Sequence, residues 1–74
     1  NSKEAFNLYK IASDEGNSAS AQYNLGLMYL KGDGIEKNID KTIEYWIKSS
    51  EQGFEVAKNS LEKLCKESSN SCKK

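Results

Sequence analysis

The chain contains an internal repeat, and this repeat constrains its fold more than any other feature. Residues 4–29 can be laid over residues 41–65, with an offset of 37 residues up to a shared glycine and of 36 residues after it. A period in the thirties that is built from paired helices is typical of an α/α solenoid, in which each unit buries its apolar face against the next. The matching residues are Leu8-Tyr9 with Tyr45-Trp46, Asp14-Glu15-Gly16 with Glu51-Gln52-Gly53, Ala21 with Ala57, and Leu25 with Leu61.

Apolar residues at helical spacing predict four helices. Proline is absent and β-branched residues are sparse, which favours an all-helical chain. We expect the first helix to end near Gly16, the second before Gly32 and the third before Gly53, while the fourth passes into a polar tail. The four apolar sets are Ala5, Leu8, Tyr9 and Ala12; Ala21, Leu25, Met28 and Tyr29; Ile39, Ile43, Trp46 and Ile47; and Ala57, Leu61, Leu64 and Cys65.

Polar residues at the expected helix starts supply caps. Asn1 with Glu4 offers a capping box, and either Asn38 or Asp40 fits the N-cap of the third helix. The expected connections are short, so consecutive helices should be antiparallel neighbours. Such helices can close into a bundle or stack as two hairpins, and the internal repeat favours the stack.

Three blocks of the sequence resemble the Sel1-like repeat family, a relative of the tetratricopeptide repeats. Residues 45–53, YWIKSSEQG, match the family pattern W-Y-x-K-A-A-E-Q-G, and residues 21–29, AQYNLGLMY, match A-Q-x-x-L-G-x-x-Y. Residues 31–35, KGDGI, match the x-x-G-x-G-V turn, and Asn38 with Lys41 fits the family's D-x-x-K spacing with Asn in place of Asp. The resemblance implies an all-α fold, with antiparallel helix hairpins stacked as a right-handed α/α solenoid fragment of about four helices.

The resemblance also suggests a domain organisation. Residues 1–66 would hold the end of one repeat, one full repeat with its loop, and a C-terminal capping helix, and residues 67–74 would form a polar tail. Gly26 should let a neighbouring helix approach closely, whereas Glu62 at the matching position predicts that stacking ends at the fourth helix. Because the first helix enters in mid-repeat, we expect at least one further helix before it.

The third helix is expected to carry core residues of mixed polarity. Thr42, Ser49 and Ser50 stand where the family usually has alanine, which raises the polarity of closely packed positions. The aromatic residues Tyr45 and Trp46, together with Tyr9 of the first helix, are more typical of a core between helices than of a ligand cage.

Composition and charge exclude several classes of function. With 74 residues the chain makes one small domain, and its 11 basic and 11 acidic residues cancel, so it has no electrostatic footprint for nucleic acid. No apolar run is long enough to insert into and span a membrane. Histidine, the commonest acid–base group and metal ligand, is absent. We therefore expect no catalytic residues, no metal and no cofactor.

Two motifs suggest chemistry but have simpler structural interpretations. The glycines of the GDG stretch, residues 32–34, should close a helix and turn the chain, whereas a phosphate-binding loop needs a strand before the glycines and a helix after them. Ser60 and Lys63 form the S-x-x-K pattern of penicillin-recognising enzymes, but the companion S-D-N and K-T-G elements are absent.

The two cysteines, Cys65 and Cys72, leave two alternatives open. On one continuous helix they would lie roughly 10 Å apart along the axis, beyond the roughly 7 Å that a disulfide spans. A local disulfide therefore requires the helix to end between them; otherwise both are free thiols.

The resemblance implies a protein-binding or scaffolding module without catalysis, whose partner is a peptide or helix of unknown identity. Two alternatives are a secreted, cysteine-rich repeat protein of β-lactamase type and a structural array end buried in a larger assembly; the compartment is left open. Tyr23 and Leu27 have a competing interpretation, in which they pack against a preceding helix. The candidate protein-binding residues are Tyr23, Leu27 and Leu30 on the second helix, and Asn59 and Lys63 on the fourth.

Overall fold

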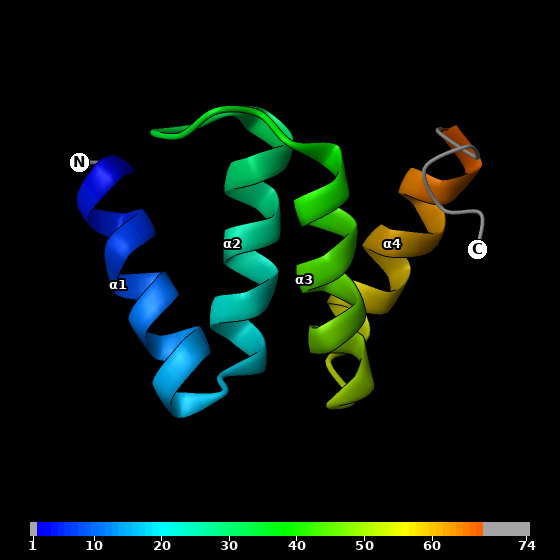
Figure 1. The fold of residues 1–74 in the computed structure, drawn as a ribbon. Helices are drawn as coiled ribbons and strands as arrows, with labels where there is room; N and C mark the ends of the chain where they lie inside the picture. The colour runs from blue at the N-terminus through cyan, green and yellow to red at the C-terminus, as the bar shows by residue number, and fades with distance from the viewer. Residues whose placement is uncertain (1, 68–74) are drawn as a thin grey trace.

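The computed structural model describes residues 2–67 and shows four helices connected by short turns and one longer loop. Each helix packs on the next in chain order, α1 on α2, α2 on α3 and α3 on α4, so that the helices form adjacent pairs (Figure 1). The predicted all-α fold is therefore confirmed. The helices are α1 (Ser2–Gly16), α2 (Ala19–Lys31), α3 (Ile39–Glu51) and α4 (Glu55–Glu67).

The helix ends follow the local signals in the sequence. Asn38 is the N-cap of α3, where its side-chain oxygen accepts a hydrogen bond of 3.1 Å from the Lys41 backbone N–H. Gly32 ends α2 in the left-handed conformation at φ 68°, and Gly53 follows α3 at φ 89°. Ser18 caps α2 in the same way as Asn38 caps α3, which the sequence analysis missed. The capping box expected from Asn1 lies outside the described residues.

The GDG stretch is a helix cap followed by a turn, as predicted. Gly34 has φ 81°, and a Cβ at this position would lie 2.9 Å from the Cβ of Ser2. The Ser2 hydroxyl donates a 2.7 Å hydrogen bond to a carboxylate oxygen of Asp33. The loop between α2 and α3 is thus held against the start of α1, which is a structural role for both glycines.

The core lies mainly between α2, α3 and α4. Trp46 is 3% exposed, Leu25 and Ala57 are fully buried, and Ile43 and Leu64 join Trp46 in one apolar cluster. Tyr45 is also buried, and its ring stacks on Tyr29 of α2. The expectation that Tyr45 and Trp46 belong to the core is therefore confirmed.

The apolar set predicted for the first helix needs a correction. Leu8, a member of this set, is 67% exposed and does not belong to the core of the described residues. Ile11, which is not in the set, is also exposed. Instead Phe6, which the helical pattern had omitted, packs edge-on against Tyr29 with 5.7 Å between ring centroids. The reason is that α1 packs mainly on α2, so that only one side of it is covered.

Candidate functional site

The contact between Gly26 and Trp46 brings α2 and α3 close together. A Cβ built on Gly26 would overlap the Nε1 and Cδ1 atoms of the Trp46 indole. The indole therefore lies directly over the backbone of α2, and its Nε1–H donates a 3.0 Å hydrogen bond to the Tyr23 carbonyl. The prediction that Gly26 permits the close approach of a neighbouring helix is confirmed.

Polar side chains of α3 add a row of hydrogen bonds to this contact. Thr42 and Ser49 have no exposed surface, and their hydroxyls donate to carbonyl oxygens along one stripe of α2. Of the three polar residues that replace the family's usual alanines, Thr42 and Ser49 are thus satisfied by the backbone of α2, whereas the Ser50 hydroxyl donates to the Ile47 carbonyl of its own helix. The bonds are Thr42 Oγ1 to Gly26 O at 2.9 Å, Trp46 Nε1 to Tyr23 O at 3.0 Å and Ser49 Oγ to Ala19 O at 2.7 Å.

Tyr23, a predicted binding residue, is half-buried and packs on both α3 and the segment that begins α4. Its ring stacks on Trp46 with 5.6 Å between centroids and an angle of 18°, and it lies equally close to Phe54 at a tilt of 45°. Its hydroxyl lies 3.3 Å from the Ser60 hydroxyl. These contacts lie toward the following helices. The competing interpretation, packing against a helix before residue 1, stays a prediction.

Leu27, Leu30 and Lys63 line one groove between α2 and α4. The groove has a volume of about 350 Å³, and Trp46, Ser60 and Leu64 complete its lining. Leu27 and Leu30 also pack against the apolar core cluster, so the groove has an apolar floor that is continuous with the core. The structure therefore brings together three of the five predicted binding residues, and Tyr23 reaches the groove through its contact with Ser60.

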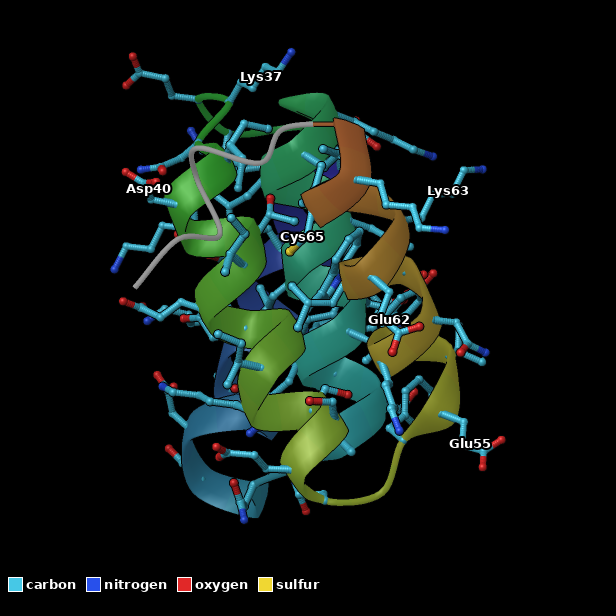
Figure 2. All side chains as sticks on the ribbon, turned by 90° about the vertical axis from the view of Figure 1, so that its right-hand side faces the viewer. Lys37, Asp40, Glu55, Glu62, Lys63 and Cys65 are labelled. Carbon is cyan, nitrogen blue, oxygen red and sulfur yellow. The ribbon has the colours of Figure 1, made fainter. Side chains whose placement is uncertain are left out.

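The residues of α4 divide between the groove and the outer surface. Lys63 and Asn59 are both exposed, but only Lys63 lines the groove. Figure 2 views α4 from its outer side: Lys63 points sideways, to the right of the view, whereas Glu62 points toward the viewer. Glu62 thus lies on the outer face of α4, which no other described helix covers.

Comparison with known proteins identifies the kind of repeat. The Sel1 repeat profile matches residues 1–17 and 19–54, which is most of the chain. The chain belongs to the Sel1 repeat family. Sel1 repeats are generally protein-interaction modules and are typically non-catalytic.

Two curated relatives are similar to this Sel1 repeat chain. The sel1-like repeat-containing protein L18 of Acanthamoeba polyphaga mimivirus is 49% identical over 43 residues, which is 58% of the chain and 7% of that protein. Activator of C kinase protein 1 of Saccharomyces cerevisiae is 35% identical over 66 residues, which is 86% of the chain and 11% of that protein. The chain thus spans about a tenth of the length of these relatives or less. No solved structure gives a significant match.

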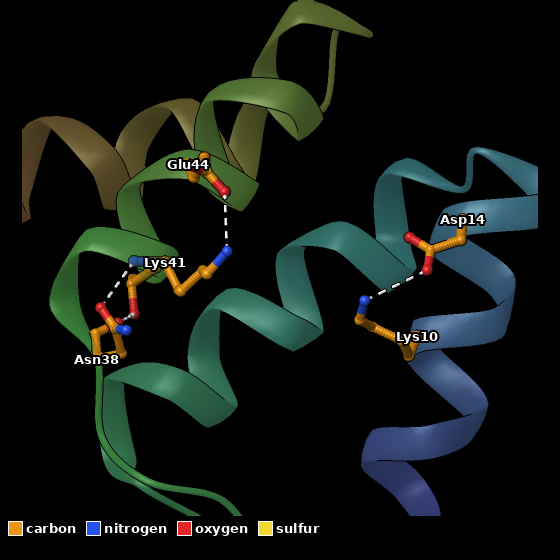
Figure 3. Close-up of polar contacts among 6 residues, drawn as sticks. Lys10, Asp14, Asn38, Lys41 and Glu44 are labelled. Carbon is orange, nitrogen blue, oxygen red and sulfur yellow. Dashed lines mark hydrogen bonds and ion pairs between the residues drawn. The ribbon is translucent and has the colours of Figure 1, made fainter.

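The charge pairs of the Sel1 repeat lie away from the groove. Lys10 pairs with Asp14 on α1 at 3.3 Å, and Lys41 pairs with Glu44 on α3 at 3.6 Å (Figure 3). The hydrogen bond to the Asp14 carboxylate raises the pKa of Lys10 above its ordinary value. Each pair joins neighbouring turns on the exposed face of its own helix, so both pairs have a structural role.

A second hollow, of about 420 Å³, lies where α1 ends and α2 begins, beside the end of α3. Its polar side chains bond to one another: Gln22 donates to Asn17, and Gln52 donates both to the Gln22 side chain and to the Asn17 carbonyl. Gln22 is buried and fully engaged in this network. We therefore assign the network to holding together the ends of α1, α2 and α3.

The Ser60–Lys63 pattern lies in the groove, where it takes part in packing. The Ser60 hydroxyl is placed beside the Tyr23 hydroxyl, and within residues 2–67 no hydrogen bond joins it to Lys63. No cluster of three or more potential metal ligands occurs among the described residues. None of the helices in residues 2–67 has the length and apolar character required to cross a membrane.

Cys65 is half-buried near the end of α4, and Cys72 lies outside the described residues. Helix α4 is described as far as Glu67, the last residue that the structure describes. A local disulfide between Cys65 and Cys72 therefore stays a prediction.

Proposed function

We propose that this Sel1 repeat chain is a non-catalytic interaction module that binds a peptide or helix of a partner protein in the groove between α2 and α4. The observation that carries the proposal is the apolar floor formed by Leu27, Leu30 and Leu64, which opens to solvent beside the exposed Lys63. A rigid apolar groove with a polar rim is a common docking site for an apolar anchor residue of a partner.

The second element of the proposal is the domain organisation. Residues 1–66 would form the repeat array with α4 as its C-terminal capping helix, and residues 67–74, whose first residue still belongs to α4, would be its polar tail. The exposed Glu62 supports a capping role, because a charged side chain at this position disfavours the close helix approach that Gly26 permits in the earlier copy.

The name of one relative also supports an interaction function. Activator of C kinase protein 1 is, by its name, a protein that acts on another protein. This chain corresponds to 11% of that relative, so the shared property we propose is protein binding through the repeat and not the relative's whole activity.

The test is affinity capture from the native host with the wild-type chain and two leucine variants, followed by quantitative mass spectrometry. Leu27→Ala shortens a side chain that lines the groove, and we expect it to lose the partner. Leu8→Ala is the matched control, because Leu8 is 67% exposed on α1 at the far end of the molecule. Circular dichroism of both variants at the capture temperature verifies that they are folded.

Tyr23→Ala is unsuitable as a binding probe, because Tyr23 contacts Trp46, Phe54 and Ser60 and its loss would disturb the fold. If folded Leu27→Ala retains every partner of the wild-type chain, the groove is not the binding site. If Leu8→Ala loses the same partners as Leu27→Ala, the effect does not belong to the groove, and the proposal is equally wrong.

A further inference from the structure

The charged side chains closest to the groove are positive. Lys63 is the one charged residue among the described residues that line the groove. On α2, Lys31 follows Leu27 by one helical turn and is exposed, and residues 19–31 contain no acidic residue. On α4, the exposed Lys66 follows Lys63 by one turn. Lys63 thus lines the groove, and two further exposed lysines lie one helical turn beyond lining residues of α2 and α4.

These lysines are not neutralised by the described acidic side chains. The ion pairs among the described residues involve Lys10 and Lys41, on other surfaces. Glu62 lies on the outer face of α4 (Figure 2). Glu55 is eight residues before Lys63 on the same helix, which is about 12 Å along the axis. Glu67 follows Lys63 by one turn of α4, while the groove lining itself contains Lys63 and no acidic residue. The groove therefore combines an apolar floor with one positive side chain at its edge.

We propose that the groove selects an acidic peptide. An aliphatic or aromatic side chain of this peptide packs on Leu27, Leu30 and Leu64, and a carboxylate within four residues of that anchor pairs with Lys63. This inference rests on the proposed function and specifies the chemistry of the partner. A carboxylate beside the lysine gains a charge-assisted hydrogen bond next to an apolar surface, whereas a basic peptide is repelled.

The apolar floor favours a peptide over other anionic partners. Nucleic acid is bound mainly through its phosphates by extended basic surfaces, and this chain has no excess of basic residues. A peptide can place an apolar anchor and a carboxylate on one short segment, which matches the juxtaposition of Leu27 and Lys63 in one groove.

The experiment is selection from a random 12-residue peptide-display library against the full chain and three variants. Lys63→Glu reverses the charge at the groove, and Lys58→Glu is its matched control, an exposed lysine of α4 outside the groove lining. Leu27→Ala tests the apolar floor. An enriched peptide and its Glu→Gln or Asp→Asn counterpart are then titrated by fluorescence polarisation at low and high salt.

We expect the wild-type chain and Lys58→Glu to enrich peptides with a carboxylate close to an apolar residue. We expect Lys63→Glu to bind such a peptide about tenfold more weakly, because an attraction becomes a repulsion, and added salt should reduce the difference. Neutralising the peptide carboxylate should weaken its binding to wild type and leave its binding to Lys63→Glu unchanged or improved.

The remaining outcomes separate the two proposals. Enrichment that depends on Leu27 but shows no acidic preference and no response to Lys63→Glu would overturn the acidic-peptide inference and leave the proposed function standing. No enrichment with the wild-type chain would contradict both. Lys63-dependent binding to phosphatidylserine vesicles without peptide enrichment would assign the lysines to a lipid surface and also contradict both.

Discussion

The indole of Trp46 occupies the space that a side chain at position 26 would need, so Gly26 and Trp46 are complementary residues of one helix contact. The same indole donates its N–H to the Tyr23 carbonyl and stacks on the Tyr23 ring. Trp46 therefore takes part in two features: it packs where α2 and α3 approach closely, and it lines the groove between α2 and α4.

Gly26→Ala should destabilise the fold. Alanine is the better helix former by about 1 kcal/mol, but its methyl group would displace the indole and stretch the bond to the Tyr23 carbonyl. Because overpacking in a core costs about 1–3 kcal/mol, we expect a net loss in the free energy of unfolding. Trp46 is the single tryptophan, so urea denaturation followed by its fluorescence measures the change.

Gly16→Ala is the control for this experiment. Apart from its chain neighbours and the backbone of its own helix, no atom lies within 4 Å of a Cβ at Gly16, and the residue ends α1 on the surface. It should be neutral or stabilise the chain by up to about 1 kcal/mol. If both alanine variants are equally stable, the Trp46 contact does not limit the size of residue 26.

Thr42→Val and Ser49→Ala should each lower the free energy of unfolding by about 1 kcal/mol, the usual contribution of one hydrogen bond. Each variant removes a buried hydroxyl that donates to a carbonyl of α2, although that carbonyl keeps its place in the helix. Ser20→Ala, an exposed serine of α2, provides the comparison. Thermal melts in which Thr42→Val and Ser49→Ala match the wild type would show that these hydroxyls contribute no stability.

The Lys10–Asp14 pair should contribute a small stability that is lost at high pH. The pKa of Lys10 is raised in the folded chain above its ordinary value of 10.5, so the contribution is present below this value and disappears as the pH rises through the folded pKa. Both side chains are largely exposed, which limits the contribution to about 0.3–0.5 kcal/mol.

A double-mutant cycle with Lys10→Met and Asp14→Asn measures this contribution as a coupling energy. The coupling should be favourable at pH 7 and approach zero near pH 12, where other groups titrate equally in all four chains. A coupling that persists unchanged at the higher pH would mean that it does not depend on the lysine charge.

Cys65 and Cys72 are predicted to form a local disulfide, because the KESSNS stretch between them in the sequence can end the helix. Alkylation of the unreduced chain should then leave its mass unchanged, and alkylation after reduction should modify both cysteines. Closing a short loop of this kind would stabilise the chain by about 2 kcal/mol in the entropy model. Alkylation of both residues without a reductant would show free thiols instead, and a Cys65→Ser/Cys72→Ser variant supplies the baseline melt.

Local signals in the sequence were sufficient to predict the four helices and most of their ends. The cap at Asn38, the left-handed Gly32 and the helical spacing of Ile43 and Trp46 depend on residues a few positions apart, so they can be recognised without knowing the fold. The internal repeat also predicted the order in which the helices pack, because each repeat must pack on its neighbour in the chain.

The partners across helices were decided by the tertiary structure. Leu8 fits a helical apolar pattern as well as Phe6 does, but only the packing of α1 on α2 shows that Phe6 meets Tyr29 while Leu8 is exposed. The sequence likewise gives no indication that the Thr42 hydroxyl meets the Gly26 carbonyl. Such contacts depend on which faces of two helices meet and on how far the helices are shifted along their axes. The spacing of residues along one helix determines neither.

The groove shows the same division. The sequence identified Leu27, Leu30 and Lys63 as candidates from the helix faces on which they lie. It did not show how deeply each side chain is buried. The structure places all three around one groove, assigns Tyr23 to the packing of α3 and α4, and leaves Asn59 on the exposed surface outside the groove lining. Burial is a property of the assembled helices, because a residue becomes half-buried only when a second helix arrives beside it.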